Sequence, residues 1–155
     1  GLIWGITMKN NWSDKVSLLL ITFWVGSLWS IAGVAYVMFN TLPDRQLAGQ
    51  LAGQFFDYVA YLGLFSAFFL LIQRLFGYGS MALKQGYFWA VLVMLLLVLA
   101  GHFGIQPILA QLKADALPSD VMQSVFSDRF ATWHGVASIA YVLQCLLGLV
   151  VVLKK

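Results

Sequence analysis

Three ionisable side chains stand inside otherwise apolar stretches of this chain: Asp57, His102 and His134. A carboxylate and two imidazoles can take up and release protons, and they are also ligands for transition metals. Ionisable groups are costly to place at membrane depth, and those found there mark ion, proton or cofactor sites. These three residues are therefore the first candidates for chemistry.

Four apolar stretches contain these residues and account for most of the 155 residues. A helix rises about 1.5 Å per residue, so roughly 20 residues cross a hydrocarbon core about 30 Å thick. The chain is 61% hydrophobic and 10% charged, whereas soluble domains carry about 25% charged residues. We predict an all-α polytopic membrane protein, a four-helix antiparallel bundle. The expected spans are residues 16–40, 50–73, 87–111 and 130–153, in one domain (16–153) after an N-terminal segment (1–15).

The basic residues predict how the chain is oriented. Most of them flank the ends of the spans that would lie on one side of the membrane, namely Lys9, Lys15, Arg74, Lys84, Lys154 and Lys155. The positive-inside rule then places both termini in the cytoplasm of a bacterial inner membrane. The chain has no basic patch outside the loops beside the membrane, so nucleic acid is not an expected partner. Residues 1–7 precede a natural start at Met8, and we interpret them either as an upstream extension or as an added segment.

Short interfacial helices are expected on the periplasmic side. Thr41, Pro43 and Asp44 are typical of a helix start, and this helix is expected to run to about Ile72, with its first turns among the lipid headgroups. The repeat over residues 46–53 places glutamines four apart, which we interpret as ordinary helix patterning. A second cap at 118–120 precedes an apolar stripe over 121–126, which predicts a short amphipathic helix.

The predicted span directions bring the ionisable residues to a common depth. The second span runs inward, so Asp57 lies in its outer half. The third runs outward and carries His102 toward its outer end, and the fourth begins outside with His134 close to its start. Met38 ends the first span at a comparable depth. We therefore expect one polar cluster in the periplasmic half of the bundle.

Further polar residues are expected to support this cluster. On the fourth span, polar and small residues recur at steps of four and three and should face the bundle interior. On the third span Gln106 lies one turn beyond His102, and on the second Tyr61 shares a face with Asp57. The stripe of the fourth span consists of His134, Ser138, Tyr141, Cys145 and Gly148.

Small residues indicate where the helices meet, because they let backbones approach closely in a membrane. The residues expected at helix contacts are Gly26, Ser30, Gly33, Gly63, Gly101 and Gly104. Pro107 follows the last two glycines, and a proline inside a helix removes a backbone donor and clashes with the preceding turn. We therefore expect a kink or a widened turn in that part of the third span.

Three interpretations of the polar cluster remain open. It can be an interhelical hydrogen-bond network that fixes helix register. It can be a metal or haem site, with copper or another transition metal held by His102, His134 and Met38, or a b haem held between the two histidines. It can be a polar pocket or proton-coupled path for a small molecule, with Asp57 as the protonatable group.

Several enzyme classes lack support in the sequence. The chain has no Walker-type phosphate loop, no HExxH metalloprotease motif and no GxSxG nucleophile elbow. Glutamate is absent, and Cys145 is the only cysteine. The carboxylates of ferritin-like metal bundles and cysteine-cluster metal sites are therefore missing as well. We do not expect an enzyme, and no residue is assigned a catalytic role.

The chain resembles a bacterial family of four-span proteins of unknown function that is related to eukaryotic transmembrane protein 205. The segments that carry this resemblance are residues 23–29, 42–45, 47–49, 53–56, 105–108 and 133–138. His134 lies in the last of them, whereas Ile108 stands where the family usually has a basic residue. The family is distantly similar to copper-resistance D proteins and to a haem-binding protoporphyrinogen oxidase, and this resemblance implies the handling of metal or haem.

The function that these observations favour is a membrane protein that binds or moves a metal ion or small molecule through its periplasmic polar cluster. A small accessory subunit that packs against a larger membrane complex is one alternative, and a b-haem redox protein is another. The expected partners are the lipid bilayer and either further copies of the chain or a membrane complex.

Overall fold

The computed structural model describes the backbone of residues 2–155 and the side chains of residues 12–155. The described residues form helices and short turns, without strands. The helices are α1 (Leu2–Thr41), α2 (Arg45–Tyr78), α3 (Gly86–Leu99), α4 (Gln106–Ala116) and α5 (Ser127–Lys154). Shorter segments are η1 (Gly79–Lys84), η2 (Ala100–Ile105) and η3 (Val121–Gln123). The side chains of residues 1–7, whose origin the sequence analysis interpreted, lie outside the described residues.

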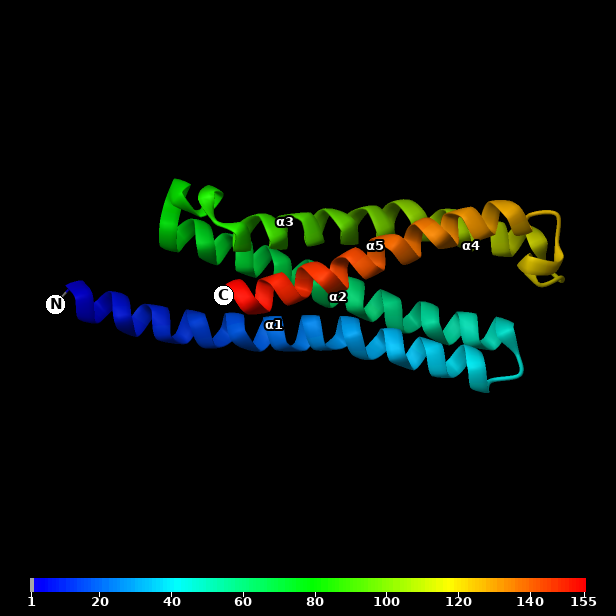
Figure 1. Ribbon diagram of the computed structural model, residues 1–155, viewed down its shortest axis with the longest axis horizontal. Coiled ribbons are helices and arrows are strands. Elements are labelled where there is room, and N and C mark those ends of the chain that lie inside the picture. The colour runs from blue at the N-terminus through cyan, green and yellow to red at the C-terminus, as the bar shows by residue number, and fades with distance from the viewer. Residues whose placement is uncertain (1) are drawn as a thin grey trace.

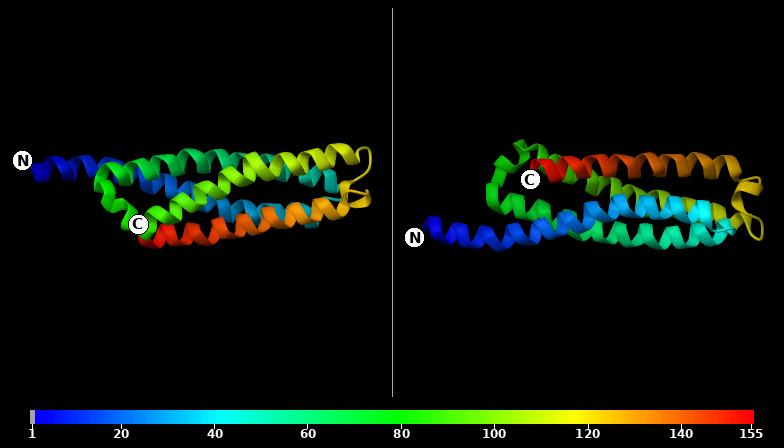
Figure 2. Two further views of the ribbon diagram at one scale, coloured as in Figure 1. Left: turned by 90° about the horizontal axis from the view of Figure 1, so that it is seen from above. Right: turned by 60° about the horizontal axis from the view of Figure 1, so that its bottom comes forward.

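The helices form an elongated antiparallel bundle, in which α3, η2 and α4 follow one another as a single rod (Figure 1). Both termini and η1 lie at one end, which we call the near end, and the turns at residues 42–44 and 117–126 lie at the far end (Figures 1 and 2). Four helices in the described residues are long and apolar enough to cross a membrane. The predicted all-α membrane bundle is therefore confirmed. α1 is continuous through residues 15 and 16, where the sequence analysis placed the start of the membrane domain.

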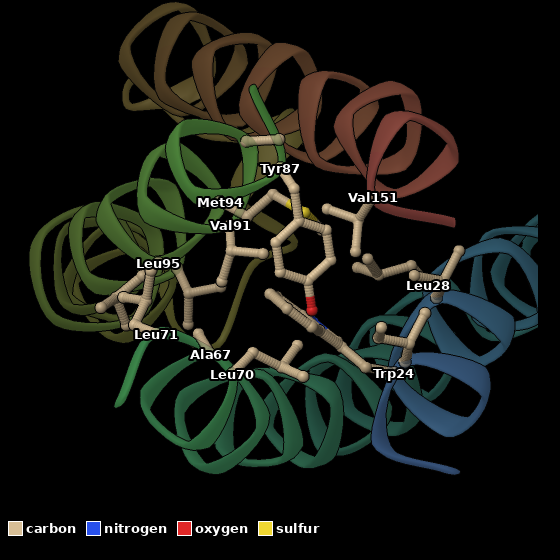
Figure 3. Close-up of a cluster of buried hydrophobic side chains, with 14 of the residues drawn as sticks. Trp24, Leu28, Ala67, Leu70, Leu71, Tyr87, Val91, Met94, Leu95 and Val151 are labelled. Atoms are coloured by element: carbon tan, nitrogen blue, oxygen red, sulfur yellow. The ribbon is translucent and has the colours of Figure 1, made fainter. Parts of the chain in front are cut away.

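A packed apolar core fills the near half of the bundle. Trp24 and Leu28 of α1 are fully buried, as are Leu70 of α2 and Val151 of α5. Figure 3 shows these side chains pointing toward the bundle axis, where they meet Val91 and Met94 of α3. Close packing of such side chains holds the four rods together at this end.

Gly63 and Gly148 are the sites of closest helix approach. A Cβ at Gly63 would lie 2.8 Å from Nε1 of Trp24, and a Cβ at Gly148 would lie 3.1 Å from a methyl carbon of Val25. Gly63 is one of the residues that the sequence analysis assigned to helix contacts.

The other expected packing residues do not meet another helix of the same chain. Gly26, Ser30 and Gly33 are exposed, and a Cβ at either glycine would have no neighbour within 4 Å. α1 instead turns the larger residues Trp24 and Leu28 inward, and their side chains make far more van der Waals contacts with the neighbouring helices than glycine or serine can. Cβ atoms at Gly101 and Gly104 would likewise meet nothing within 4 Å.

The far-end turns differ from the expected interfacial helices. α2 begins at Arg45, and its N-cap is Asp44, whose carboxylate accepts from the backbone N–H groups of Gln46 and Leu47. Asp44 therefore has the capping role that the sequence assigned to Thr41. The expected amphipathic helix over 121–126 is only the single turn η3, which Asp120 caps. Residues 121–126 are too few to form a longer helix in the connection between α4 and α5.

The widened turn expected in the third span is confirmed. η2 is a π-helical segment, in which the backbone N–H of Gln106 donates to the carbonyl of Gly101, five residues earlier. Pro107 has no N–H to give to the turn before it, and its ring excludes the carbonyl of Phe103 from the usual position. The widened turn accommodates both constraints, and such insertions are frequent at functional sites.

Candidate functional site

Asp57 and His102 form the one carboxylate–imidazole contact among the described side chains. Oδ1 of Asp57 lies 3.5 Å from Nδ1 of His102. Asp57 comes from α2 and His102 from the π-helical segment η2. The sequence predicted that these two residues lie at a common depth, and in the structure their side chains are in contact.

The helix rise explains why the two residues meet. At the near end, Nη1 of Arg74 donates to Oε1 of Gln85 over 2.8 Å, which sets the register of α2 against α3. Asp57 stands 17 positions before Arg74, and His102 stands 17 positions after Gln85. Both residues are therefore about 25 Å from the near-end hydrogen bond, measured along the bundle. That distance places the pair close to the far boundary of a hydrocarbon core about 30 Å thick.

Aromatic rings flank the imidazole on two sides. The rings of Tyr61 and Phe103 each pack edge-to-face against His102, with centroids 4.8 Å away. The His102 side chain is 13% exposed, whereas that of Asp57 is 56% exposed. The imidazole is therefore held in a fixed orientation, and the carboxylate lies beside it at the open edge of the bundle.

His134 lies beyond this pair. A Cβ at Gly86 would stand 3.4 Å from Cδ of Lys154, so these two residues lie at the same level. From that level His102 is 16 positions away and His134 is 20, which puts His134 about one helical turn farther out. The His134 ring is exposed and stacks on Phe130, with centroids 5.8 Å apart. The expected convergence of both histidines with Asp57 does not occur, because α5 begins farther from the core than its sequence position suggested.

Met38 also lies beyond the pair. The side chain of Gln73 donates to Ser13, which aligns α1 with α2 near the near end. From this level Asp57 is 16 positions away and Met38 is 25. The difference of nine positions corresponds to about 13 Å along the bundle. Met38 is therefore not a ligand to the Asp57–His102 pair within one chain.

The residues expected to support the cluster fall into two groups. Tyr61 contacts His102, and Gln106 is half-buried one turn farther along α4. On α5, Ser138 is exposed and donates to the backbone carbonyl of His134, so it faces away from the core. Tyr141 and Cys145 do turn inward.

A seam of hydrogen bonds between α1 and α5 was not expected from the sequence. The hydroxyl of Tyr141 donates to the carbonyl of Leu28, and Nε1 of Trp29 donates to the carbonyl of Cys145 over 3.2 Å. Each bond runs from a side chain to the backbone of the facing helix. Every residue has a backbone carbonyl, so the sequence does not show which carbonyls accept these bonds. Only the inward position of Tyr141 was predicted.

Comparison with known protein families now identifies the chain at family level. A family model described as "Domain of unknown function (DUF4149)" matches residues 19–118. The chain belongs to the DUF4149 family. No curated protein and no solved structure matches it. The DUF4149 match includes both Asp57 and His102, whereas α5 and His134 follow the matched residues.

The donor set of this DUF4149 chain limits the chemistry of the site. No group of three or more His, Cys, Asp or Glu side chains that could hold a metal ion occurs among residues whose side chains are described. Asp57 and His102 together offer one carboxylate and one imidazole. A b haem held between His102 and His134 does not fit this arrangement, because the two rings lie at different levels and His134 stacks on Phe130.

Proposed function

We propose that this integral membrane protein binds a transition-metal cation between Asp57 and His102. Imidazole nitrogen and carboxylate oxygen are ligands that zinc and copper accept together. The flanking rings of Tyr61 and Phe103 hold the imidazole in place, so that the site is prepared before the ion arrives. The remaining coordination positions are available to water or to groups from outside the chain.

The separation of the two donor atoms carries this proposal. The Oδ1–Nδ1 distance of 3.5 Å is longer than a hydrogen bond between these atom types, which spans about 2.7–3.2 Å. Two ligands of a tetrahedral metal, each about 2.1 Å from the ion, lie about 3.4 Å apart. The pair therefore has the spacing of two metal ligands and is too wide for an optimal hydrogen bond.

Access to the site is one-sided. The core around Trp24, Leu70 and Met94 closes the near half of the bundle. On the far side, Asp57 is the innermost of a series of exposed polar residues on α2 that also includes Gln46, Gln50 and Gln54. A cation can therefore approach from the far end and stop at the pair, which supports binding rather than conduction through the bundle.

The distribution of basic residues supports a periplasmic location for this site. With Lys154 and Lys155 on the cytoplasmic side of a bacterial inner membrane, the far end faces the periplasm. The proposed cation then comes from outside the cell. Two ligands are fewer than the three or four that proteins give to a bound zinc ion, so we include a partner in the proposal, either another copy of the chain or a larger membrane complex.

The test is metal binding by the purified protein in detergent, with Zn²⁺ and Cu²⁺ as probes. We expect binding near one ion per site by titration calorimetry. Asp57→Asn and His102→Gln each remove one ligand, and each should weaken affinity at least tenfold, because even changes to the residues around the ligands cost about 10–100-fold. Elemental analysis of the same samples measures the ion that remains after desalting.

Matched controls use ionisable residues at the same end of the bundle. His134→Gln and Asp128→Asn alter an imidazole and a carboxylate that lie outside the pair, and both variants should bind as the wild type does. Absence of binding of either metal by the wild type would refute the proposal. Equal losses in His134→Gln and His102→Gln would also count against it, since they would indicate non-specific binding to surface imidazoles.

A further inference from the structure

One face of α2 in its far half is exposed, and its one contact to another described helix is that of Asp57 with His102. Gln46, Gln50 and Gln54 recur every four residues, and Asp57 follows after three, so the four side chains form one stripe. All four are exposed. The opposite face of the same helix carries the buried residues Ala48 and Ala52, which pack into the bundle. We call the exposed stripe the glutamine face.

Two glycines border the glutamine face at the spacing of close helix contacts. Gly49 and Gly53 are four residues apart, and small residues at this spacing let two membrane helices approach along their backbones. A Cβ at Gly49 would lie 3.8 Å from Nζ of Lys113 of the same chain, whereas a Cβ at Gly53 would meet nothing within 4 Å. No helix of the described chain uses the close approach that Gly53 permits.

The depth of the glutamine face makes lipid a poor cover. Gln54 stands 20 positions before Arg74, so it lies about 30 Å from the near-end register bond, and Asp57 lies about 5 Å deeper than Gln54. Gln54 is therefore close to the far boundary of the hydrocarbon core, Asp57 lies inside it, and Gln46 and Gln50 lie in the headgroup region beyond it. None of the three glutamine amides hydrogen-bonds to another described residue. Unpaired polar groups are costly at the deep end of the face, at Gln54 and Asp57, and a cover that supplies donors and acceptors lowers this cost.

A second copy of the same helix supplies them. Each glutamine amide has two N–H donors and one carbonyl acceptor, so identical amides can pair with each other. Copies of a membrane protein insert in the same orientation, and a two-fold axis along the membrane normal then places equal residues at equal depth. Gln50 would face Gln50 of the other copy and Gln54 would face Gln54, with the glycines allowing the backbones to approach.

We infer that two copies of this chain associate through the glutamine face of α2. The association places Asp57, which is 56% exposed in the single chain, beside the second copy at the deep end of the interface, and it leaves the far end of the bundle open to a cation. The interface itself depends on the face of α2 and not on metal binding. The two proposals can therefore fail separately.

Cysteine cross-linking in native membranes tests this interface. Gln50→Cys and Gln54→Cys are made in a chain whose buried Cys145 is replaced by alanine, and a short bis-maleimide is added. Both variants should give a product of twice the mass of the chain. A maleimide reagent avoids copper-based oxidation, so that the result does not depend on the proposed metal site.

Matched variants separate a specific contact from random collision. Tyr36→Cys lies on α1 five positions before its end, level with Gln50, and Tyr36 is 71% exposed. It should give no cross-linked product. Gly53→Leu places a larger side chain beside the glutamine face, at a position where a Cβ meets nothing within 4 Å in the chain. It should lower the yield of cross-linked dimer at Gln50→Cys at least fivefold. Gly26→Leu, on the uncovered face of α1, should leave that yield unchanged.

Four results would overturn the inference. One is rapid labelling of Gln50→Cys and Gln54→Cys by a water-soluble maleimide without dimer formation, which would show that water covers the face. Another is a product whose mass corresponds to a different protein. The third is an equal dimer yield from Tyr36→Cys, and the fourth is loss of dimer in Gly26→Leu but not in Gly53→Leu.

Discussion

The indole of Trp24 packs directly on the backbone of Gly63, so that a Cβ at Gly63 would stand 2.8 Å from Nε1. Trp24 is fully buried in a core cluster to which α1, α2, α3 and α5 all contribute side chains. This contact sets the distance between α1 and α2 in the middle of the bundle. In a membrane, where no water drives helices together, such close packing is the main source of association.

Gly63→Ala should therefore destabilise the protein. The added methyl must displace the indole, and overpacking of this kind costs about 1–3 kcal/mol. Reversible unfolding in mixed micelles measures the change. Gly33→Ala is the control, because a Cβ at Gly33 meets nothing within 4 Å, and it should leave the free energy of unfolding unchanged or slightly raised. Equal destabilisation by the two substitutions would contradict the packing described for Gly63.

Tyr141→Phe should weaken the seam between α1 and α5. It removes the hydroxyl that donates to the carbonyl of Leu28 and preserves the ring that packs edge-to-face on Phe56. Interhelical hydrogen bonds of this type contribute about 0.6 kcal/mol on average in membrane bundles, with a maximum near 1.7. We expect a loss in that range in the same unfolding assay.

The control for this substitution is Tyr58→Phe. Tyr58 is 60% exposed on α2, and its hydroxyl has no hydrogen bond to the described residues. A loss of stability in Tyr58→Phe as large as in Tyr141→Phe would show that the bond to Leu28 is not the cause. Combining Tyr141→Phe with Trp29→Phe measures whether the two bonds of the seam act independently.

The sequence predicts the four spans, the widened turn before Pro107 and a common depth for Asp57 and His102, because each follows from composition, proline chemistry or helix rise. It does not predict the position of His134. That position depends on how the turn after α4 is built, and η3 places the start of α5 farther out than a short loop would.

The small residues of α1 show a second limit of the sequence. A face with Gly26 and Gly33 has the composition of a packing face, yet the helix buries the opposite side, where Trp24 and Leu28 lie. Both sides satisfy a rule for membrane helices, and only the side chains of the neighbouring helices decide between them. The choice is made by the space beside Gly63, which accepts the indole of Trp24.

Arg74→Lys should destabilise the near end although it preserves the charge. The guanidinium lies over the ring of Tyr87, 3.9 Å from its centroid, and near the ring of Tyr78 at 5.4 Å, while it also donates to Gln85. A lysine ammonium does not have the planar shape that allows stacking and hydrogen bonding together. We expect a loss of about 1–2 kcal/mol, in line with a partly desolvated cation–π contact.

Arg45→Lys is the matched control for this charge-preserving change. Arg45 is exposed at the first position of α2, and it makes no ion pair or cation–π contact with the described side chains. Its substitution should leave the unfolding curve unchanged. If Arg74→Lys also left the unfolding curve unchanged, the stacking of Arg74 on Tyr87 would not contribute to stability. The register of α2 against α3 would then be set by the core alone.

The orientation of the bundle can be tested through reporters at its two ends. We expect a fluorescent protein fused after Lys155 to be bright, and an alkaline phosphatase fused at that position to be inactive, because both report a cytoplasmic terminus. The reverse result is expected for fusions in the turn at residues 117–120. An active phosphatase after Lys155 would place the Asp57–His102 pair in the cytoplasmic half and reverse the proposed route of the cation.

Pro107→Ala should separate the stability of the bundle from the geometry of the proposed metal site. Alanine supplies the missing N–H and removes the ring that excludes the carbonyl of Phe103, so that η2 can return to a regular α-helix. Alanine is the best helix former and proline the worst, and we expect the free energy of unfolding to rise by about 1 kcal/mol or more.

The same change should lower metal affinity. The widened turn holds one residue more than a turn of regular α-helix does. When it is lost, the residues on one side of it shift by one position, which corresponds to a rotation of about 100° on a helix. His102 then turns away from Asp57, although both ligands are still present, and we expect Zn²⁺ or Cu²⁺ to bind at least tenfold more weakly. Pro43→Ala, in the turn before α2, is the control and should alter neither property. A variant at Pro107 that is more stable and binds metal as tightly as the wild type would show that the π-helical segment does not position His102.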